Sequence, residues 1–266
     1  MVVFKDMRFF RGRSKWFWLV LQFTVVLLVL NNQAFATLEI TQWTLVDPDE
    51  SWSWLYTDPV SQSGRLDFAP SGYRVGPAWV VGNVQMPEVS SISLTIEVRD
   101  IQNRNDDDFF GFCFGYQDNA HFYLVDWKGQ TQGYDWGDPV VVNDDTAEEG
   151  LKLKKIDGSW TRDGLWGGTD GIGVTTLAGA VGEGWQYDTQ YDFEIVMSPE
   201  RILVTLDGVE VFNVVDNSFR GGTVALYALS QDVVFFSNVT VIPEPATLIL
   251  LGLGGLVLLR TKRRTF

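Results

Sequence analysis

Apolar and polar residues alternate over much of the middle of the chain. Residues 92–99 read Ile-Ser-Leu-Thr-Ile-Glu-Val-Arg, so that every second side chain is apolar. Successive side chains of a β-strand point to opposite faces of its sheet, so a period of two is typical of a strand with one buried face. Similar runs occur at residues 151–156, 191–197, 223–230 and 233–241, and helical spacing is nearly absent. We therefore expect an all-β domain.

Two short polar connections predict β-hairpins. Asp207 and Gly208 separate two alternating runs within residues 201–212. This pair is a strong hairpin signal, because a type I′ turn needs positive φ at both central residues and Asp and Gly tolerate it. Residues 117–120, Gln-Asp-Asn-Ala, divide two aromatic-rich runs within residues 109–127 in the same way.

The spacing of all these runs predicts about ten to thirteen strands. No repeat of fixed period occurs in the sequence, which argues against solenoids and propellers. Two packed sheets bury many alternating faces at once. The predicted fold is therefore a two-sheet sandwich of the jelly-roll (lectin or concanavalin-like) type.

Residues 1–36 have the three parts of a secretory signal peptide. Five Lys and Arg lie in the first 15 residues, a mainly apolar run follows at residues 16–30, and Ala34 and Ala36 flank Phe35 as a small-x-small cleavage site. An uncleaved transmembrane anchor is the alternative, because the basic region before the apolar run is long. Both interpretations export the middle of the chain.

Residues 242–266 form a tail with a Pro-Glu-Pro triplet, an apolar run at residues 246–259 and a basic end. The prolines fix φ and remove backbone donors, so we expect them to end the preceding domain. The apolar run would be one hydrophobic helix of roughly 21 Å, shorter than the ~20 residues of a permanent span. It therefore predicts a transient anchor in the inner membrane, with the basic end in the cytoplasm.

The tail resembles the PEP-CTERM sorting signal, whose triplet is here Pro243, Glu244 and Pro245. That signal occurs in Gram-negative bacteria that make exopolysaccharide, where a membrane protease-transpeptidase called exosortase is thought to cut near the triplet. The resemblance implies exosortase as the processing partner. It also implies that a membrane-anchored intermediate is passed to the cell surface or extracellular matrix.

Residues 37–241 are predicted to form one domain, and this domain is strongly acidic. The whole chain has a formal net charge of −14, but the two ends hold nine of its 20 Lys and Arg and only two of its 34 acids. Residues 37–241 therefore keep 11 basic and 32 acidic residues. Such a surface repels phosphate backbones and attracts divalent cations, so we expect no nucleic-acid partner. Cys113 is the only cysteine, so no internal disulfide is possible.

Three ordered blocks of sequence resemble the thrombospondin C-terminal domain, a lectin-like jelly roll. Residues 106–117 read Asp-Asp-Asp-Phe-Phe-Gly-Phe-Cys-Phe-Gly-Tyr-Gln, and residues 122–132 continue with an aromatic run, Trp-Lys and Thr-Gln. The other two blocks lie within residues 150–191 and 216–237, and the resemblance covers most of residues 47–239. It implies a calcium-binding adhesion or recognition module. Because no Arg-Gly-Asp sequence occurs, integrin-type adhesion is not implied.

The loop of Asp106, Asp107 and Asp108 is the main candidate for chemistry. Calcium takes six to eight oxygen ligands, and adjacent carboxylates on a loop anchored by a strand could supply several. The family resemblance points to calcium here, and we add Asp47, from a second acidic loop, to the candidate site. A solvated turn is the alternative for both loops.

Catalysis finds little support in the sequence. His121 is the only histidine and begins an aromatic run, and no nucleophile elbow accompanies it. Cys113 lies between two phenylalanines and is better suited to packing than to attack. The paired acids at Glu-x-Asp-x-x-Glu spacing that occur in jelly-roll glycosidases are absent. We therefore expect that this protein is not an enzyme.

Nine tryptophans in residues 37–241 are a further candidate feature. Four of them, Trp136, Trp160, Trp166 and Trp185, lie in Gly- and Asp-rich stretches, where aromatic rings could stack on the apolar face of a sugar. Trp136 and Trp160 are the candidate ligand-binding residues. The alternative is that tryptophans fill the core or cover its ends. The sequence thus predicts an exported, non-enzymatic surface or matrix protein that binds exopolysaccharide, a surface glycan or a protein. The alternative is a glycoside hydrolase or lyase on the same scaffold.

Overall fold

The computed structural model describes residues 40–58, 60–68, 76–100, 106–133, 146–167 and 173–243. These residues belong to one compact unit, Ala36–Glu244. Across these described ranges, no helix has the length and apolar character needed to cross a membrane. The predicted signal peptide with Ala34 and Ala36, the apolar run 246–259, Glu244 and Pro245 lie outside the described residues and stay predictions.

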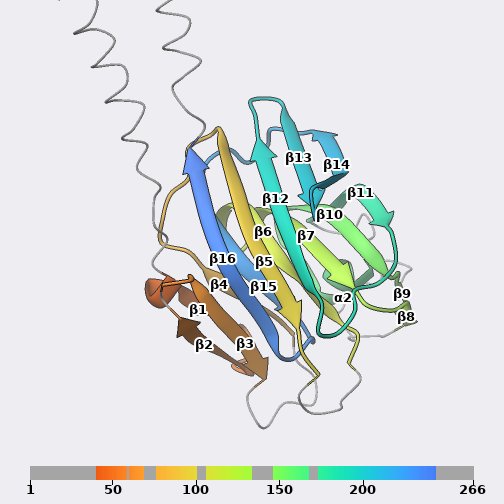
Figure 1. Cartoon of the computed structure of the whole chain (residues 1–266). Helices are drawn as coiled ribbons and strands as arrows, with labels where there is room; N and C mark the ends of the chain where they lie inside the picture. The colour runs from red at the N-terminus through yellow and green to blue at the C-terminus, as the bar shows by residue number, and fades with distance from the viewer. Residues whose placement is uncertain are drawn as a thin grey trace, which may run out of the picture. The chain divides into compact units, whose positions relative to one another are not determined.

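Two seven-stranded antiparallel sheets form the sandwich, as the sequence predicted (Figure 1). The first sheet has the order β1-β4-β15-β6-β7-β10-β11. Its strands are β1 (Thr44–Val46), β4 (Pro77–Val81), β15 (Thr223–Leu229), β6 (Phe109–Asp118), β7 (His121–Lys128), β10 (Gly150–Asp157) and β11 (Val174–Val181).

The second sheet lies in front of the first in Figure 1 and has the order β14-β13-β12-β5-β16-β3-β2. Its strands are β14 (Val209–Val215), β13 (Arg201–Leu206), β12 (Gln190–Met197), β5 (Ser90–Val98), β16 (Val234–Pro243), β3 (Ser63–Phe68) and β2 (Trp52–Asp58). A small third sheet pairs β8 (Gln132–Gly133) with β9 (Thr146–Ala147). The described residues also include two short helices, η1 (Ile40–Gln42) and α2 (Arg162–Gly167).

Apolar and polar residues alternate along strands of the second sheet such as β5, so that the apolar face of the strand lies in the core between the two sheets. In β5, Ile92, Leu94 and Ile96 are almost fully buried, while Ser91 and Ser93 are partly exposed. The buried residues pack against aromatic side chains of the first sheet such as Phe112, in one cluster. This burial of apolar surface is the main contribution to the stability of the sandwich.

The outer face of the first sheet has a core of its own. Its buried residues include Phe109, Phe122 and Tyr227, and the short helix α2 covers them with Leu165 and Trp166. Strand β6 is therefore buried on both faces over eight consecutive residues. This is why its sequence is a continuous aromatic run without the alternation of a half-exposed strand.

Both predicted hairpins are confirmed. Strands β6 and β7 pair antiparallel next to each other, as do β13 and β14. Asp207 has a φ of 51° and Gly208 a φ of 76°, the positive values that a type I′ turn requires.

The predicted number of strands was too low, because several strands carry no readable alternation. Strand β1 has only three residues, and β8 and β9 have two each. Strand β4 is buried at four consecutive positions and β11 is built mostly of small residues and threonines. Period-two patterns detect a strand only when it is long enough and exposes one face.

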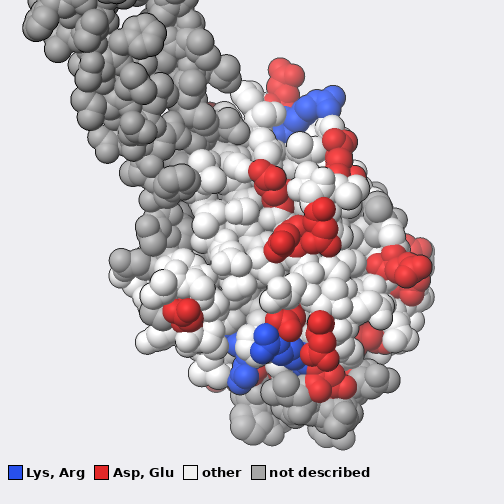
Figure 2. All heavy atoms as spheres, in the orientation of Figure 1, with Lys and Arg blue, Asp and Glu red and all other residues white. Residues whose placement is uncertain are grey.

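Acidic side chains are scattered over the face of the second sheet, whereas basic ones gather in two places (Figure 2). Several of the basic residues pair with neighbouring acids. Arg65 contacts Asp67 at 2.5 Å and Arg99 contacts Glu97 at 2.7 Å. On this face the domain therefore has few positive charges without an acidic partner, which agrees with the excess of acidic over basic residues in residues 37–241.

Candidate functional site

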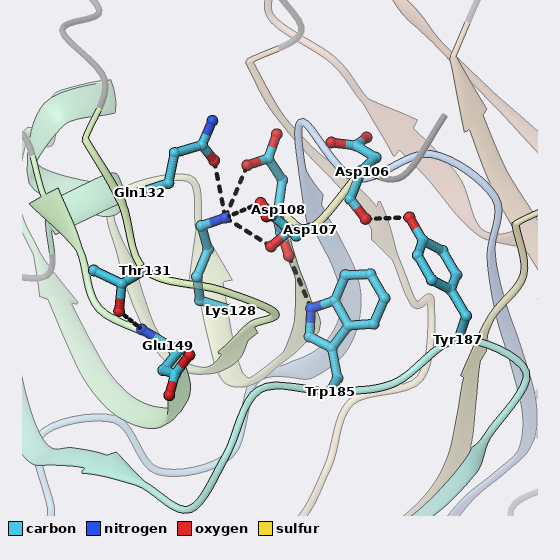
Figure 3. Close-up of polar contacts among 9 residues, drawn as sticks. All are labelled: Asp106, Asp107, Asp108, Lys128, Thr131, Gln132, Glu149, Trp185 and Tyr187. Carbon is cyan, nitrogen blue, oxygen red and sulfur yellow. Dashed lines mark hydrogen bonds and ion pairs between the residues drawn. The ribbon is translucent and has the colours of Figure 1, made fainter. Parts of the chain in front are cut away.

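Three segments of the chain meet around the start of β6 and build the candidate site (Figure 3). Residues 106–108 lead into β6, residues 129–132 follow β7, and residues 184–187 follow β11. Residues 106–108 are called the acidic loop below. Segments up to about 80 residues apart in sequence are thus brought to one place by the sheet.

The pairing of β6 with β7 fixes the position of the acidic loop. Phe109 pairs with Lys128, and the main-chain N–H of Gly129 donates to the carbonyl of Asp107 at 2.9 Å. Gly184 packs so closely on Gly129 that a Cβ on Gly184 would overlap the carbonyl oxygen of Gly129. Only glycine permits this approach of two backbones.

The Lys128 side chain is fully buried, and its ammonium lies within the acidic loop (Figure 3). Its Nζ donates to the carbonyl of Asp107 at 2.7 Å and to Oδ1 of Asp107 at 2.6 Å. It also donates to Oδ1 of Asp108 at 3.1 Å and to Oε1 of Gln132 at 3.0 Å. A buried charge is costly unless it is paired and hydrogen-bonded, and here both conditions are met. Lys128 therefore serves as an internal counter-ion of the loop.

Asp106 differs from its two neighbours. In Figure 3 it is linked through its main-chain carbonyl to the hydroxyl of Tyr187, and not to Lys128. Burial first, and then the nearby Asp108 carboxylate, raise the pKa of Asp106 to about 8, although the main-chain N–H of Asp232 opposes the shift. At neutral pH this carboxyl therefore holds a proton, and a cation beside it would favour the ionised form.

Trp185 and Tyr187 connect the third segment to the acidic loop. The indole N–H of Trp185 donates to the carbonyl of Asp108 at 3.0 Å. The hydroxyl of Tyr187 donates to the carbonyl of Asp106, and burial together with the charge of Asp106 raises the pKa of Tyr187 to about 12. The two rings meet edge to face, with centroids 5.0 Å apart at 88°. These contacts make a rigid aromatic wall.

A pocket of about 180 Å³ lies between the acidic loop and this wall. Its lining combines carboxylates, amides and aromatic rings: Asp106, Asp107, Gly129, Gln130, Trp185, Gln186 and Tyr187. The volume is less than the ~300 Å³ of drug-sized sites. Carboxylate and amide groups accept and donate hydrogen bonds to hydroxyls. The pocket can therefore hold a small polar group.

Asp47 lies in a loop of its own and caps main-chain groups. Its Oδ1 accepts the N–H of Asp49 at 3.1 Å, and its Oδ2 accepts the N–H of Trp52 at 2.7 Å. Asp49 in turn pairs with Arg162 of α2 at 2.8 Å. Asp47 and Asp49 thus both have structural partners.

The structure does not bring the four predicted calcium ligands together. In the parts of the chain that can be described, no three His, Cys, Asp or Glu side chains are grouped so that they could hold a metal ion. Asp107 and Asp108 bind the Lys128 ammonium instead. Calcium binding by the acidic loop and by Asp47 stays a prediction.

Of the two tryptophans predicted to bind sugar, the structure describes one. Trp136 lies outside the described residues. The indole N–H of Trp160 donates to the carbonyl of Asn119 at 2.7 Å, and its ring lies 5.3 Å from that of Trp79, at the edge of the outer core. Trp160 thus packs at the edge of the core and Trp166 is buried within it, whereas Trp185, the fourth candidate for sugar stacking, lines the pocket.

His121 and Cys113 lie apart from the pocket lining. Nδ1 of His121 is 2.8 Å from Oδ1 of Asp118 in the turn between β6 and β7. Cys113 is fully buried in the outer core, and burial raises the pKa of its thiol well above the usual range. A thiol that stays protonated is inert, which agrees with a packing role.

The sequence predicted the acidic loop as a candidate site but did not predict the residues that contact it. Lys128 resembles any lysine at a strand end, and nothing in its neighbourhood indicates complete burial. Gln130, Gln186 and Tyr187 are polar residues of loops that follow different strands. Only the matching Trp-Lys pair in the family block could have drawn attention to Lys128.

Comparison with known proteins agrees with both resemblances. Residues 73–243 match the family model of the thrombospondin C-terminal region. The chain belongs to this family. Residues 241–264 match the PEP-CTERM protein-sorting motif, so this thrombospondin C-terminal domain is followed directly by a sorting signal.

The curated relatives are much longer than the stretch they share with this thrombospondin C-terminal domain. Thrombospondin-1 of Xenopus laevis is 32% identical over 152 residues, which are 52% of this chain and 13% of that protein. Thrombospondin-3a of Danio rerio is 35% identical over 147 residues, which are 50% of this chain and 15% of that protein.

Two solved structures are similar at low identity. The carbohydrate-binding module CBM66 of Bacillus subtilis has a TM-score of 0.49 and 16% identity, over 75% of this chain and 94% of that one. The exoplasmic/lumenal domain of VIP36 in its Ca²⁺-bound form has a TM-score of 0.48 and 12% identity, over 76% and 84%.

Proposed function

We propose that this protein is an exported surface or matrix module that binds saccharide without cleaving it. The observation that supports the proposal best is the pocket at the acidic loop, whose lining includes two aspartates, two glutamines, Trp185 and Tyr187. Hydroxyl groups of a sugar satisfy such donors and acceptors, and aromatic rings pack against its C–H faces. The volume suits one sugar residue, such as a chain end or side branch.

The charge of the pocket narrows the class of saccharide. Asp107 lines it as a carboxylate, whereas the Lys128 ammonium, the cation that the described residues place at the loop, is buried and already holds four acceptors. Among the described residues, a carboxylated or sulfated sugar would therefore lie beside the Asp107 carboxylate and could not pair with Lys128. We therefore propose a neutral, hydroxyl-rich polysaccharide as the ligand.

Titration calorimetry of the purified protein with neutral and uronic-acid oligosaccharides tests this proposal. We expect neutral sugars to bind and uronates not to bind. Gln130→Ala and Gln186→Ala should each weaken binding by about 3- to 10-fold, the value of one hydrogen bond. Gln117→Ala, at the exposed end of β6, is the matched control and should bind normally. No binding of any neutral sugar at millimolar concentration would contradict the proposal.

We further propose that calcium binds beside Asp106. Two pocket residues, Asp107 and Gln130, could add side-chain oxygens, and waters could complete the shell. The support is the raised pKa of Asp106, because a buried carboxyl next to another carboxylate gains most from a cation.

Thermal unfolding with saturating calcium and then with EDTA tests the calcium proposal. Calcium should raise the melting temperature at pH 8, and Asp106→Asn should remove the effect. Glu200→Gln changes an exposed acid outside the pocket and should keep the calcium response. An unchanged melting temperature in the wild-type protein would refute calcium binding and leave the saccharide proposal intact.

For the tail we propose processing by exosortase and association of the mature protein with exopolysaccharide. The sorting motif at residues 241–264 supports this route. Replacing Pro243, Glu244 and Pro245 by alanine should leave a folded domain in the inner membrane with its tail intact. Cell fractionation and immunoblotting measure this, and normal processing of the triple variant would overturn the sorting proposal.

One observation favours an enzyme as the second candidate. Asp106, whose raised pKa keeps a proton on it at neutral pH, lines the pocket together with Asp107, and glycoside hydrolases use a pair of carboxyl groups of which one is a general acid. An assay for new reducing ends on neutral polysaccharides separates the candidates. The binding module gives none, whereas activity that is lost in both Asp106→Asn and Asp107→Asn would establish the enzyme.

A further inference from the structure

The last strand of the sandwich runs directly into the sorting motif. Strand β16 ends at Pro243, the first proline of the triplet, and the motif match begins at residue 241. In the register with β5, Val241 lies opposite Ile92, Ile242 opposite Ser91, and Pro243 opposite Ser90. Figure 1 shows β16 alongside β5 in the front sheet. The sheet and the sorting motif therefore overlap, and no linker separates them.

Strand β16 is held firmly up to this overlap. Val239 and Val241 are 1% and 2% exposed and belong to the core between the sheets. The hydroxyl groups of Ser93 and Thr240 are 2.6 Å apart across the strand pair. Detaching the strand upstream of Ile242 would expose two core valines to water. Fraying is therefore limited to Ile242 and Pro243.

Enzymes that bind peptides as extended strands use the backbone groups of their substrate on several consecutive residues. A residue whose backbone is paired in a sheet cannot occupy such a groove at the same time. A protease that reads the triplet must therefore act on the chain beyond β16 or first pull β16 away from β5. The buried valines argue against the second route.

We infer that the tail is cut C-terminal to Pro243 while β16 stays paired with β5, so that the mature domain keeps the complete strand. This inference rests on the proposed processing of the tail. In the net reaction one peptide bond beyond Pro243 breaks. The acyl carbon of that bond forms a new bond to the oxygen of water or to the nitrogen of a primary amine on a surface acceptor. The proton lost by the water or amine passes to the new amino group of the released tail.

Intact-mass analysis of the processed protein from its own host gives the first test. We expect the C-terminal residue of the domain to be Pro243 or a later residue. A terminus at Ile242 or upstream would overturn the inference and leave the sorting proposal standing. A wild-type protein that keeps its whole tail would instead refute the sorting proposal.

A cross-strand disulfide gives the second test. Ser91 and Ile242 lie directly opposite each other and are partly exposed, at a Cα separation of about 4.5–5.5 Å that suits a disulfide. In the double variant Ser91→Cys/Ile242→Cys the bond locks the end of β16, and the native Cys113 is fully buried. We expect processing within about twofold of wild type. Processing that falls tenfold with the bond formed, but is normal in the single variant Ser91→Cys, would show that β16 must detach.

Discussion

The acidic loops at residues 106–108 and 47–50 are both rich in carboxylates, but the partners of these carboxylates differ. The loop at residues 106–108 surrounds a buried ammonium and lines a pocket. In the loop at residues 47–50, Asp47 caps main-chain N–H groups and Asp49 pairs with an arginine at the surface. The first loop therefore depends on one buried charge, and the second on several weak contacts.

The difference shows that a run of acids does not by itself indicate a metal site. Side chains that accept backbone N–H groups are already satisfied, as Asp47 is. Carboxylates forced into the interior need a counter-charge, which here comes from Lys128 for Asp107 and Asp108. Burial still raises the pKa of Asp108 although Lys128 opposes the shift, and it raises the pKa of Asp106, which does not contact Lys128, to about 8. The following variants test this comparison.

The largest effect is expected for Lys128→Met. The change leaves Asp107 and Asp108 without their buried partner, which costs about 3–5 kcal/mol of unfolding free energy in comparable cases. Urea denaturation measures the loss. The triple variant with Asp107→Asn and Asp108→Asn should recover part of it, because the uncompensated charges are gone. Lys155→Met, which removes a partly exposed lysine paired with Asp216, is the control and should lose much less.

The next effect is a pH dependence caused by Asp106. Its pKa is about 8 in the folded protein and 3.8 in its ordinary state. Between these values the folded state holds a proton that the unfolded chain has released, so stability from this group is complete below about pH 4 and is lost as pH rises to 8. The slope approaches about 1.4 kcal/mol per pH unit.

Denaturation of wild type and Asp106→Asn at pH 5 to 8.5 checks this dependence. The variant should become the more stable of the two as pH rises, because asparagine carries no charge to bury. Calcium at saturation should flatten the wild-type curve if it binds beside Asp106. Parallel curves for the two proteins would contradict the raised pKa.

A smaller loss is expected for Asp47→Ala, about 1–2 kcal/mol, because two main-chain N–H groups lose their acceptor. Asp47→Asn keeps a side-chain oxygen and should lose less than alanine does. Thermal unfolding with and without calcium measures both variants. The calcium response should be that of wild type, and its loss would place Asp47 at the cation after all.

The smallest effect is expected for Asp49→Asn. Its pair with Arg162 is partly exposed, with side-chain exposures of 21% and 36%, and salt screens such pairs, so the loss should stay below about 1 kcal/mol. Chemical denaturation at low and high salt measures it. If Asp49→Asn lost as much unfolding free energy as Lys128→Met, the two loops would not differ in how strongly stability depends on their ion pairs.

The sequence predicted strands of two kinds. β5 and β12 alternate because water contacts one face and the core the other. β6, β7 and β15 are buried on both faces and were predicted from long runs rich in aromatic and aliphatic residues. β4 was missed because it has only five residues, four of them buried, so it is too short for such a run and shows no alternation. Alternation reports the difference between two faces, so it is lost when both are covered.

The sequence by itself determined the all-β class, the two hairpins, both family memberships and the acidic loop, because each depends on neighbouring residues or on an ordered motif. The tertiary structure alone decided that Lys128 neutralises this loop and that Gln130, Gln186 and Tyr187 share its pocket. It also decided that Asp47 lies elsewhere and that β16 is paired up to Pro243. These features depend on contacts between distant segments, and burial in the folded domain, not residue type, sets the charge state of the groups involved.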